Sequence, residues 1–165
     1  MNRAVLAIRA FDESHWDRVL RFADTAVPYD LEGNRVWLTN RRQFTATGRV
    51  RRHYAAFRQG GQMIAYGSIE QQPDVDGYRL FIVPGARGLW DTAAQALYLR
   101  LAEDLAELGA TLVWMREYAR DVELIRFAQE RGFVEVEAFD LPGPTGSFMI
   151  IRLEKRLGSA VEVPG

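Results

Sequence analysis

Cysteine is absent from this sequence of 165 residues, and its absence excludes both a disulfide framework and a zinc site with thiolate ligands. The only histidines, His15 and His53, lie too far apart in the sequence to match a metal-ligand spacing. Neither histidine stands in the sequence context of a catalytic triad, so the sequence gives poor support for a nucleophilic hydrolase. We expect no metal in this protein.

Long hydrophobic runs are also missing, because no stretch of about 18 consecutive apolar residues occurs anywhere in the chain. We therefore expect a soluble, cytoplasmic protein that does not contact a membrane. A composition of 48% hydrophobic and 26% charged residues is sufficient for one core. The sequence predicts a single domain over residues 1–157, followed by a loose tail over 158–165.

A large charge of one sign is the third absence, since the formal net charge is −1 and the isoelectric point is near 6.1. This balance gives no general attraction for nucleic acid, and we expect none as a partner. One local cluster of basic residues does stand out, consisting of Arg41, Arg42, Arg49, Arg51 and Arg52. We interpret it as a solvated face, with a site for an acidic substrate or a cofactor phosphate as the alternative.

The first half of the chain has the patterning of two helical segments and four strands. The strand predictions cover residues 5–11, 51–58, 63–71 and 78–83, and the helix predictions cover 16–26 and 35–44. The pair Gly60-Gly61 predicts a tight hairpin turn between the second and third strands. The last three of these strands are expected to form an antiparallel meander.

The second half alternates between helices and strands. Apolar residues at intervals of three and four predict a helix over 91–108 that ends at Gly109, and Asp121 is a plausible N-cap for a helix that runs through Arg131 to Gly132. Strands are predicted over 111–116, 133–141 and 147–153. A strand that follows a helical crossover usually runs parallel to its neighbour, so the sheet is expected to be mixed.

The most informative stretch runs from Phe81 to Leu105, where a buried strand, a turn rich in Pro, Gly and Arg, and an amphipathic helix follow one another. The N-terminus of such a helix offers unpaired backbone N–H groups and the positive end of the helix dipole, which together can bind a diphosphate. The turn lacks the Gly-Lys-Ser/Thr ending of a nucleotide P-loop and the glycine spacing of a dinucleotide site. The pattern therefore indicates a different phosphorylated cofactor.

The order of these elements resembles that of the GNAT superfamily of acyl-CoA N-acyltransferases, and the likeness spans Leu6 to Leu157. Val83-Pro84 and Arg87-Gly88 open the central helix as in that family. The segment 121–133 is similar to the family's Asn/Asp-x-x-Ala-x-x-x-Tyr-x-x-x-Gly-Phe helix, particularly in members found as tandem domains in bacteria. The resemblance implies an α+β fold in which about four helices flank a splayed, mixed sheet of about seven strands.

The resemblance also implies acetyl-CoA as co-substrate, bound in the wedge between the strands at 78–83 and 111–116. The pantetheine arm would bind the backbone of the first strand, and the diphosphate would lie over the turn and the start of the helix. The cofactor-binding residues implied in this way are Phe81, Ile82, Val83, Arg87, Gly88, Leu89, Trp90, Asp91, Thr92 and Asp121.

Three positions depart from the family pattern. Trp90 and Thr92 stand where the cofactor loop usually has two small residues, and Ala128 stands where many members have a tyrosine that protonates the departing thiolate. Tyr118, which we place in the loop before the helix, is the nearest replacement in the sequence. The alternative for Tyr118 is an ordinary half-buried tyrosine.

Transfer of an acyl group to an amine requires that the amine lose a proton, and a carboxylate near the splayed strands usually removes it. The two candidates are Glu70, near the end of the third strand, and Glu117, just past the fifth. Each has an alternative interpretation as a solvated acid at a strand end.

Two hypotheses about function follow. The first is an N-acetyltransferase that transfers an acetyl group from acetyl-CoA to the primary amine of a small molecule or peptide by direct attack. The second is a GNAT-like domain that has lost catalysis and serves as an acyl-CoA sensor or a protein-interaction module, and it is motivated by Trp90, Thr92 and Ala128. Exposed strand edges in sheets of this kind often pair, which leaves a homodimer open.

Overall fold

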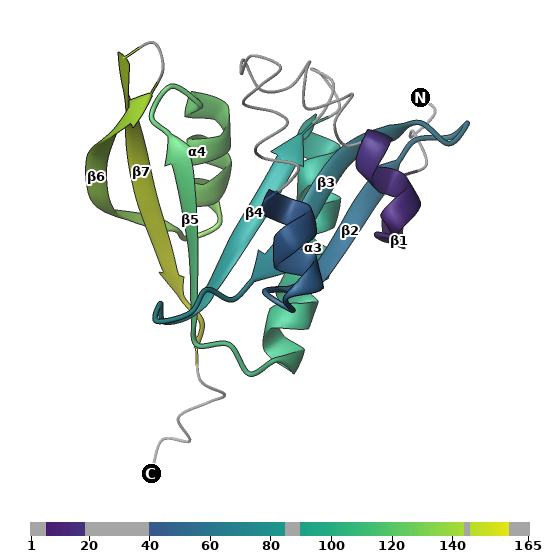
Figure 1. The fold of residues 1–165 in the computed structure, drawn as a ribbon, viewed down its shortest axis with the longest axis horizontal. Helices are drawn as coiled ribbons and strands as arrows, with labels where there is room; N and C mark the ends of the chain where they lie inside the picture. The colour runs from purple at the N-terminus through teal and green to yellow at the C-terminus, as the bar shows by residue number, and fades with distance from the viewer. Residues whose placement is uncertain (1–5, 19–39, 85–89, 144–145, 159–165) are drawn as a thin grey trace.

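A computed structural model of the chain describes residues 6–18, 40–84, 90–143 and 146–158. The described residues contain one sheet of seven strands in the order β1-β2-β3-β4-β5-β7-β6 (Figure 1). Only β4 and β5 pair in parallel, and every other neighbouring pair is antiparallel. The expected mixed α+β sheet is therefore confirmed. The strands are β1 (Ala7–Ala10), β2 (Val50–Phe57), β3 (Met63–Glu70), β4 (Tyr78–Pro84), β5 (Leu112–Tyr118), β6 (Val134–Gly143) and β7 (Gly146–Arg156).

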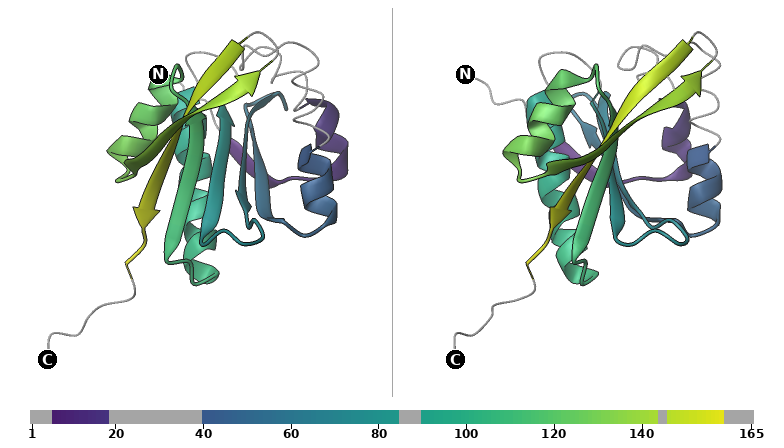
Figure 2. Two further views of the ribbon diagram at one scale, coloured as in Figure 1. Left: turned by 60° about the vertical axis from the view of Figure 1, so that its left-hand side comes forward. Right: turned by 90° about the vertical axis from the view of Figure 1, so that its left-hand side faces the viewer.

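Helices cover both faces of the sheet (Figure 2). One face carries α3 (Trp90–Glu107) and α4 (Val122–Glu130), and the other carries the short helix η1 (Glu13–His15) and two further helical stretches at residues 16–18 and 40–46. The predicted apolar stripe of α3 is buried against the sheet, through Ala94, Leu97, Leu101 and Leu105. None of the helices in the described ranges has the length and hydropathy needed to cross a membrane.

Glycines end the elements where the sequence predicts turns. Gly60 and Gly61 have φ angles of 97° and 83° in the turn between β2 and β3, and Gly109 has a φ of 67° just after α3. Asp121 is the N-cap residue of α4, as predicted, but its side chain makes no capping hydrogen bond. The carboxyl group of Asp121 is therefore not used to hold the helix terminus.

The strand β5 is longer than the sequence predicts, which corrects the positions of two site residues. Glu117 and Tyr118 were expected after the end of this strand, yet both belong to β5 and pair with Ile151 and Ile150 of β7. The long antiparallel ladder with β7 continues the strand through both residues. Tertiary pairing thus extends β5 past the point where its apolar run ends.

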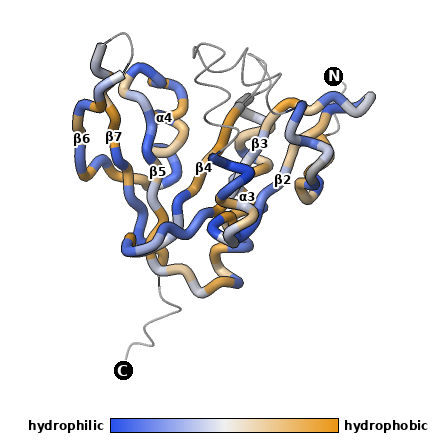
Figure 3. Tube along the Cα trace, in the orientation of Figure 1, coloured by the Kyte–Doolittle hydropathy of each residue, from blue (hydrophilic) through white to orange (hydrophobic). Residues whose placement is uncertain are grey.

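The sheet opens between β4 and β5, and this feature positions the candidate site. The two strands pair only at Tyr78 with Val113 and at Arg79 with Trp114, whereas β3 stays paired with β4 as far as Pro84. Beyond Arg79, the separated part of β4 is hydrophobic along its length (Figure 3). Its backbone groups that face β5 have no strand partner, so the predicted splay is confirmed.

Helix α3 is held to the sheet by a buried hydrogen bond as well as by apolar packing. Tyr54 Oη on β2 donates to Asp104 Oδ2 on α3 over 2.6 Å, and Asp104 is 1% exposed. We expect Tyr54→Phe to lower the free energy of unfolding by about 1–2 kcal/mol, because a buried carboxylate loses its donor.

Tyr98→Phe is the matched control for this substitution. The Tyr98 hydroxyl accepts a hydrogen bond from Lys155 Nζ over 3.0 Å, but that pair is only partly buried. We expect its loss to cost less than about 1 kcal/mol. Urea denaturation of both variants makes the comparison, and equal losses would contradict the structural role of the Tyr54–Asp104 bond.

Candidate active site

The residues predicted to bind a cofactor lie on three elements around the opening of the sheet. Phe81, Ile82 and Val83 are on the separated part of β4, Thr92 is exposed in the first turn of α3, and Asp121 precedes α4. Helix α3 begins at Trp90, so the backbone N–H groups of its first turn have no partners within the helix. Arg87, Gly88 and Leu89 lie outside the described residues, as do the side chains of Trp90 and Asp91.

Glu117 is a buried carboxyl group on the β5 side of the opening. Its residue is 8% exposed, and burial raises the pKa of Glu117 to about 8. The guanidinium groups of Arg79 and Arg41 act in the opposite direction, while the nearby carboxylate of Asp121 raises this pKa further. A carboxyl group with a pKa in this range can both accept and release a proton near neutral pH.

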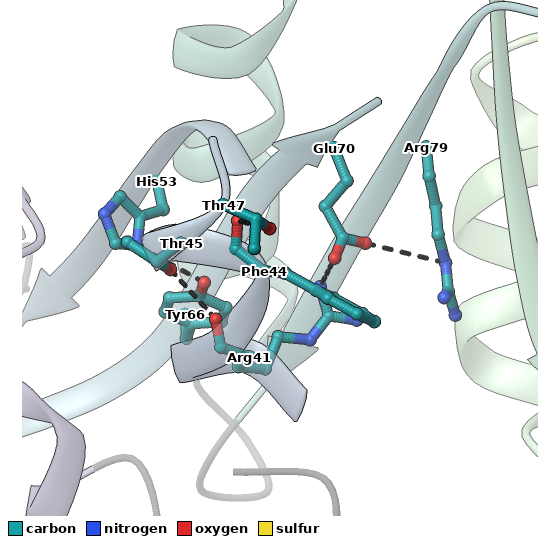
Figure 4. A network of polar contacts seen from close by, with 8 residues as sticks. All are labelled: Arg41, Phe44, Thr45, Thr47, His53, Tyr66, Glu70 and Arg79. Carbon is teal, nitrogen blue, oxygen red and sulfur yellow. Dashed lines mark hydrogen bonds and ion pairs between the residues drawn. The ribbon is translucent and has the colours of Figure 1, made fainter. Parts of the chain in front are cut away.

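Glu70 has a different environment from the one expected. It is 1% exposed at the end of β3, where it forms an ion pair with Arg41 and lies 3.9 Å from Arg79 Nε (Figure 4). The interpretation of Glu70 as a solvated acid is therefore wrong. Each of its oxygens faces a guanidinium group at ion-pair distance, and the contact with Arg79 is too long for a hydrogen bond.

The basic cluster at residues 41–52 is not one solvated face. Arg41 is 3% exposed, and its guanidinium lies 3.8 Å from the centre of the Phe81 ring as well as beside Glu70. Arg51 is exposed and bonds to Gln71, as expected for a solvated residue. The helical stretch 40–46 places Arg41 beside Glu70 on β3 and Phe81 on β4. The local sequence alone does not reveal this placement.

Arg79 connects the two carboxyl groups. Its guanidinium interacts electrostatically with both Glu70 and Glu117 and lies 5.5 Å from the centre of the Phe81 ring. Burial and the charge of Arg41 lower the pKa of Arg79 to about 10. The sequence analysis missed this residue, although a lone arginine beside buried apolar residues of a central strand was an available signal.

Tyr118 is half-buried at the end of β5. Its ring packs edge-on against Phe148 with the centroids 5.8 Å apart, and the guanidinium of Arg120 lies 5.1 Å from the centre of the same ring. Burial raises the pKa of the Tyr118 hydroxyl, although the charge of Arg120 opposes this shift. The phenol therefore keeps its proton at neutral pH. Ala128, by contrast, is fully buried in the core and offers no proton donor.

In the part of the chain that the structure describes, no group of three His, Asp or Glu side chains lies close enough together to hold a metal ion. What the described residues do combine is a buried carboxyl group, a phenol, an unpaired edge of β4 and the N-terminus of α3, the next described element along the chain.

Comparison with known proteins gives structural matches only, since no family model and no curated protein matches the chain. The ribosomal-protein-S18-alanine N-acetyltransferase of Escherichia coli is similar with a TM-score of 0.70 and 17% identity, over 96% of this chain and 98% of that one. An acetyltransferase of the GNAT family from Streptococcus pneumoniae has a TM-score of 0.68 and 17% identity, and the match covers 93% of this chain and 100% of that one.

A third similar structure, from Salmonella typhimurium, was solved with its cofactor acetyl-CoA. It has a TM-score of 0.71 and 13% identity, over 96% of this chain and 97% of that one. Likenesses at these identities establish architecture. The chain has the fold of GNAT-family acetyltransferases, with the splayed, seven-stranded mixed sheet that the sequence predicts.

Proposed function

We propose that this protein is an N-acetyltransferase that transfers the acetyl group of acetyl-CoA to a primary amine. The observation that carries the proposal is the opening of the sheet after the Arg79–Trp114 pair, along a strand that is followed in the chain by the N-terminus of α3. An unpaired strand edge supplies amide partners for a pantetheine arm, and a helix N-terminus supplies donors for a diphosphate. Acetyl-CoA contains both groups, joined in one molecule.

The proposed cofactor contacts follow the order of the chain. The backbone of Phe81, Ile82 and Val83 holds the pantetheine arm, and the first turn of α3, including the exposed Thr92, receives the diphosphate. Acetyl-CoA supplies an activated acyl group on sulfur, which an amine nitrogen can attack. The chain's own residues then have two tasks, which are to remove a proton from the amine and to return one to the thiolate.

Glu117 is the proposed proton acceptor. Its raised pKa makes it a stronger base than an exposed glutamate, and its position on β5 faces the separated part of β4. As the new bond between carbon and nitrogen forms, the carboxylate of Glu117 takes the proton from nitrogen. Tyr118 is the next residue on β5 and projects from the opposite face of the strand, so its hydroxyl approaches the opening from the other side. As the bond between carbon and sulfur breaks, the Tyr118 hydroxyl donates its proton to the thiolate, and solvent restores that proton.

The second candidate function is an acyl-CoA sensor without catalysis, and the burial of Ala128 favours it. The position where many members of the superfamily carry the proton donor holds a methyl group inside the core. Under this alternative, acetyl-CoA binds in the same place and no acyl group is transferred.

Titration calorimetry with acetyl-CoA, followed by assay against a panel of amines, tests the proposal. We expect a dissociation constant below about 1 mM, which corresponds to roughly 4 kcal/mol of binding free energy. Adenosine 3′,5′-bisphosphate, which lacks the pantetheine arm, is the control and is expected to bind more weakly. Binding with turnover supports the transferase, binding without turnover on any amine supports the sensor, and no binding at millimolar cofactor overturns both.

A further inference from the structure

Two buried hydrogen-bond donors lie side by side at the last pair of residues that joins β4 to β5. Arg79 and Trp114 are partners in the strand register, and Trp114 is 1% exposed. Within the described residues, neither Arg79 Nε nor Trp114 Nε1 has a hydrogen-bond acceptor, since Glu70 Oε2 is 3.9 Å from Arg79 Nε. Unsatisfied buried donors are rare in folded proteins, and a pair of them next to an opening calls for an explanation.

Positive charge gathers around the same two residues. The guanidinium of Arg79 lies 5.6 Å from the centre of the Trp114 ring, and that of Arg152 lies 4.4 Å from it. Arg152 pairs with Glu154 over 3.0 Å, whereas no carboxylate in the described part of the chain lies within ion-pair distance of Arg116.

Arg116 follows Trp114 by two residues on β5, so both side chains project from the same face of the strand. Arg116 is partly exposed, and its charge contributes to lowering the pKa of Arg79. Glu70, the nearest carboxylate to Arg79, is already shared with Arg41. Glu117 also interacts with Arg79, but its pKa of about 8 leaves it mostly protonated at neutral pH. Among the described residues, the guanidinium groups of this region therefore outnumber the ionised carboxylates that face them, which are Glu70 and Glu154.

We propose that Arg79, Trp114, Arg116 and Arg152, here called the Trp114 cluster, bind an oxyanion carried by the acceptor. The acceptor is then a small amine that bears a carboxylate or phosphate group. This substrate class specifies the acceptor of the proposed acetyltransferase, so it rests on the proposed function. Arg116 provides the exposed contact. The guanidinium of Arg152 covers the Trp114 indole, and the Arg152 side chain is 20% exposed. If this side chain turns toward the bound oxyanion, it uncovers the buried donors of Arg79 and Trp114.

The two neighbouring strands set how the two ends of such an acceptor can lie. Glu117 lies one residue beyond Arg116 on β5, so its side chain projects from the opposite face of the strand to those of Trp114 and Arg116. The carboxyl group of Glu117 nevertheless interacts electrostatically with Arg79 across the opening of the sheet, so an acceptor whose amine and oxyanion are separated by a few carbon atoms can reach both residues. The inference therefore points to short ω-amino acids and aminoalkyl phosphates rather than to simple alkylamines.

The first test measures binding of the anion alone and does not depend on catalysis. Glutarate and inorganic phosphate are titrated into the protein, with sodium chloride of matched ionic strength as a control. We expect glutarate or phosphate to raise the melting temperature where chloride does not, and Arg116→Gln to weaken that response at least fivefold in apparent affinity. Trp114→Phe keeps an aromatic side chain, although a smaller one, and removes the N–H donor, so it is expected to weaken binding as well.

Arg51→Gln is the matched control, because Arg51 is an exposed arginine outside the Trp114 cluster. It is expected to keep the response of the unmodified protein. Arg116→Lys preserves the charge and is expected to restore part of the response, which separates loss of the site from damage to the fold. No specific stabilisation of the unmodified protein by either anion, or an equal loss in the Arg51 variant, would overturn the inference.

The second test uses ω-amino acids of two to six carbons, each beside its own amide, and phosphoethanolamine beside ethanolamine. A hydrogen-bonded ion pair predicts a preference of about 10- to 100-fold in kcat/KM for the anionic member. Arg116→Gln is expected to reduce the ratio of kcat/KM between each acid and its amide toward one, whereas Arg51→Gln keeps that ratio. The series with the higher kcat/KM, either the ω-amino acids or phosphoethanolamine, identifies which oxyanion the site binds.

The two tests distinguish the ways in which the proposals can fail. Anion binding without acetylation of any amine rejects the transferase and leaves the anion site in place. Acetylation with equal kcat/KM for acids and amides rejects the anionic acceptor and leaves the transferase in place.

Discussion

Replacing Glu117 with glutamine is expected to lower kcat by about 100- to 10,000-fold, the range that a positioned general base contributes. The amide has nearly the same shape but cannot accept the proton of the attacking amine. Affinity for acetyl-CoA, measured by calorimetry, is expected to stay within about twofold of the unmodified protein, because the proposed cofactor contacts lie on β4 and α3. Retained turnover in this variant would remove Glu117 from the mechanism.

The pH dependence of the reaction checks the same assignment. The pKa of Glu117 is about 8, so the carboxyl group is mostly protonated at pH 6 and mostly ionised above pH 9. If the ionised form is the base, kcat/KM rises about tenfold per pH unit below pH 8 and levels off above it. The ammonium group of the acceptor contributes an inflection of its own, which the glutamine variant retains.

Asp121→Asn identifies which inflection belongs to Glu117. The carboxylate of Asp121 raises the pKa of Glu117, so its removal is expected to move that inflection to lower pH. The inflection of the acceptor is expected to stay where it is. Asp121 makes no capping hydrogen bond to α4, so the substitution removes a charge without removing a helix cap. A profile that does not move in this variant would contradict the assignment.

Gly77→Ala is expected to destabilise the protein by about 3 kcal/mol or more. Gly77 has a φ of 81°, and a Cβ atom at this position would lie 2.6 Å from the backbone oxygen of Leu112. The nearest atom, the Leu112 oxygen, belongs to the backbone at the start of β5, and Gly77 directly precedes β4, where the two halves of the sheet are joined. The strands would have to move apart at their only paired positions.

Gly48→Ala separates steric overlap from backbone strain. Gly48 has a similar φ of 77°, but nothing lies within 4 Å of a Cβ atom built there. We expect this control to cost about 1 kcal/mol. Thermal unfolding is expected to show a melting temperature roughly 10 °C lower for the Gly77 variant and only a few degrees lower for the Gly48 variant. Equal losses would show that the contact with Leu112 does not matter.

Most of the fold could be predicted because its signals are local. The turn at Gly60-Gly61 and the apolar spacing of Ala94, Leu97, Leu101 and Leu105 are read within a few residues, and the structure confirms the elements that they predict. The end of β5 was predicted incorrectly, because its last residues are held by pairing with β7, which follows more than 25 residues later in the chain.

In the candidate site, too, the positions of residues could be predicted locally, whereas their environments could not. Glu70 and Glu117 could be selected from their positions near strand ends, but their environments could not, since Arg41 reaches Glu70 from a different segment and Arg79 from the neighbouring strand. Arg41 was interpreted as part of a solvated surface for the same reason. Arg79, Trp114 and Arg116 were not selected. An arginine within an apolar central strand marks Arg79 as unusual, but the local sequence does not show which carboxyl groups it faces or that Trp114 and Arg116 lie beside it.

The amino-acid sequence by itself determined the order of the strands, the helices that became α3 and α4, and the resemblance to GNAT acyltransferases, because hydrophobic periodicity and turn residues act over short distances. Most of the helix predicted over 16–26, and the first residues of the one predicted over 35–44, lie outside the described residues. Only the tertiary structure decided where the sheet opens, which carboxyl group is ion-paired and which is left with a raised pKa. Those properties depend on charges and burial contributed by strands far apart in the chain, and such contributions exist only once the strands have been brought together.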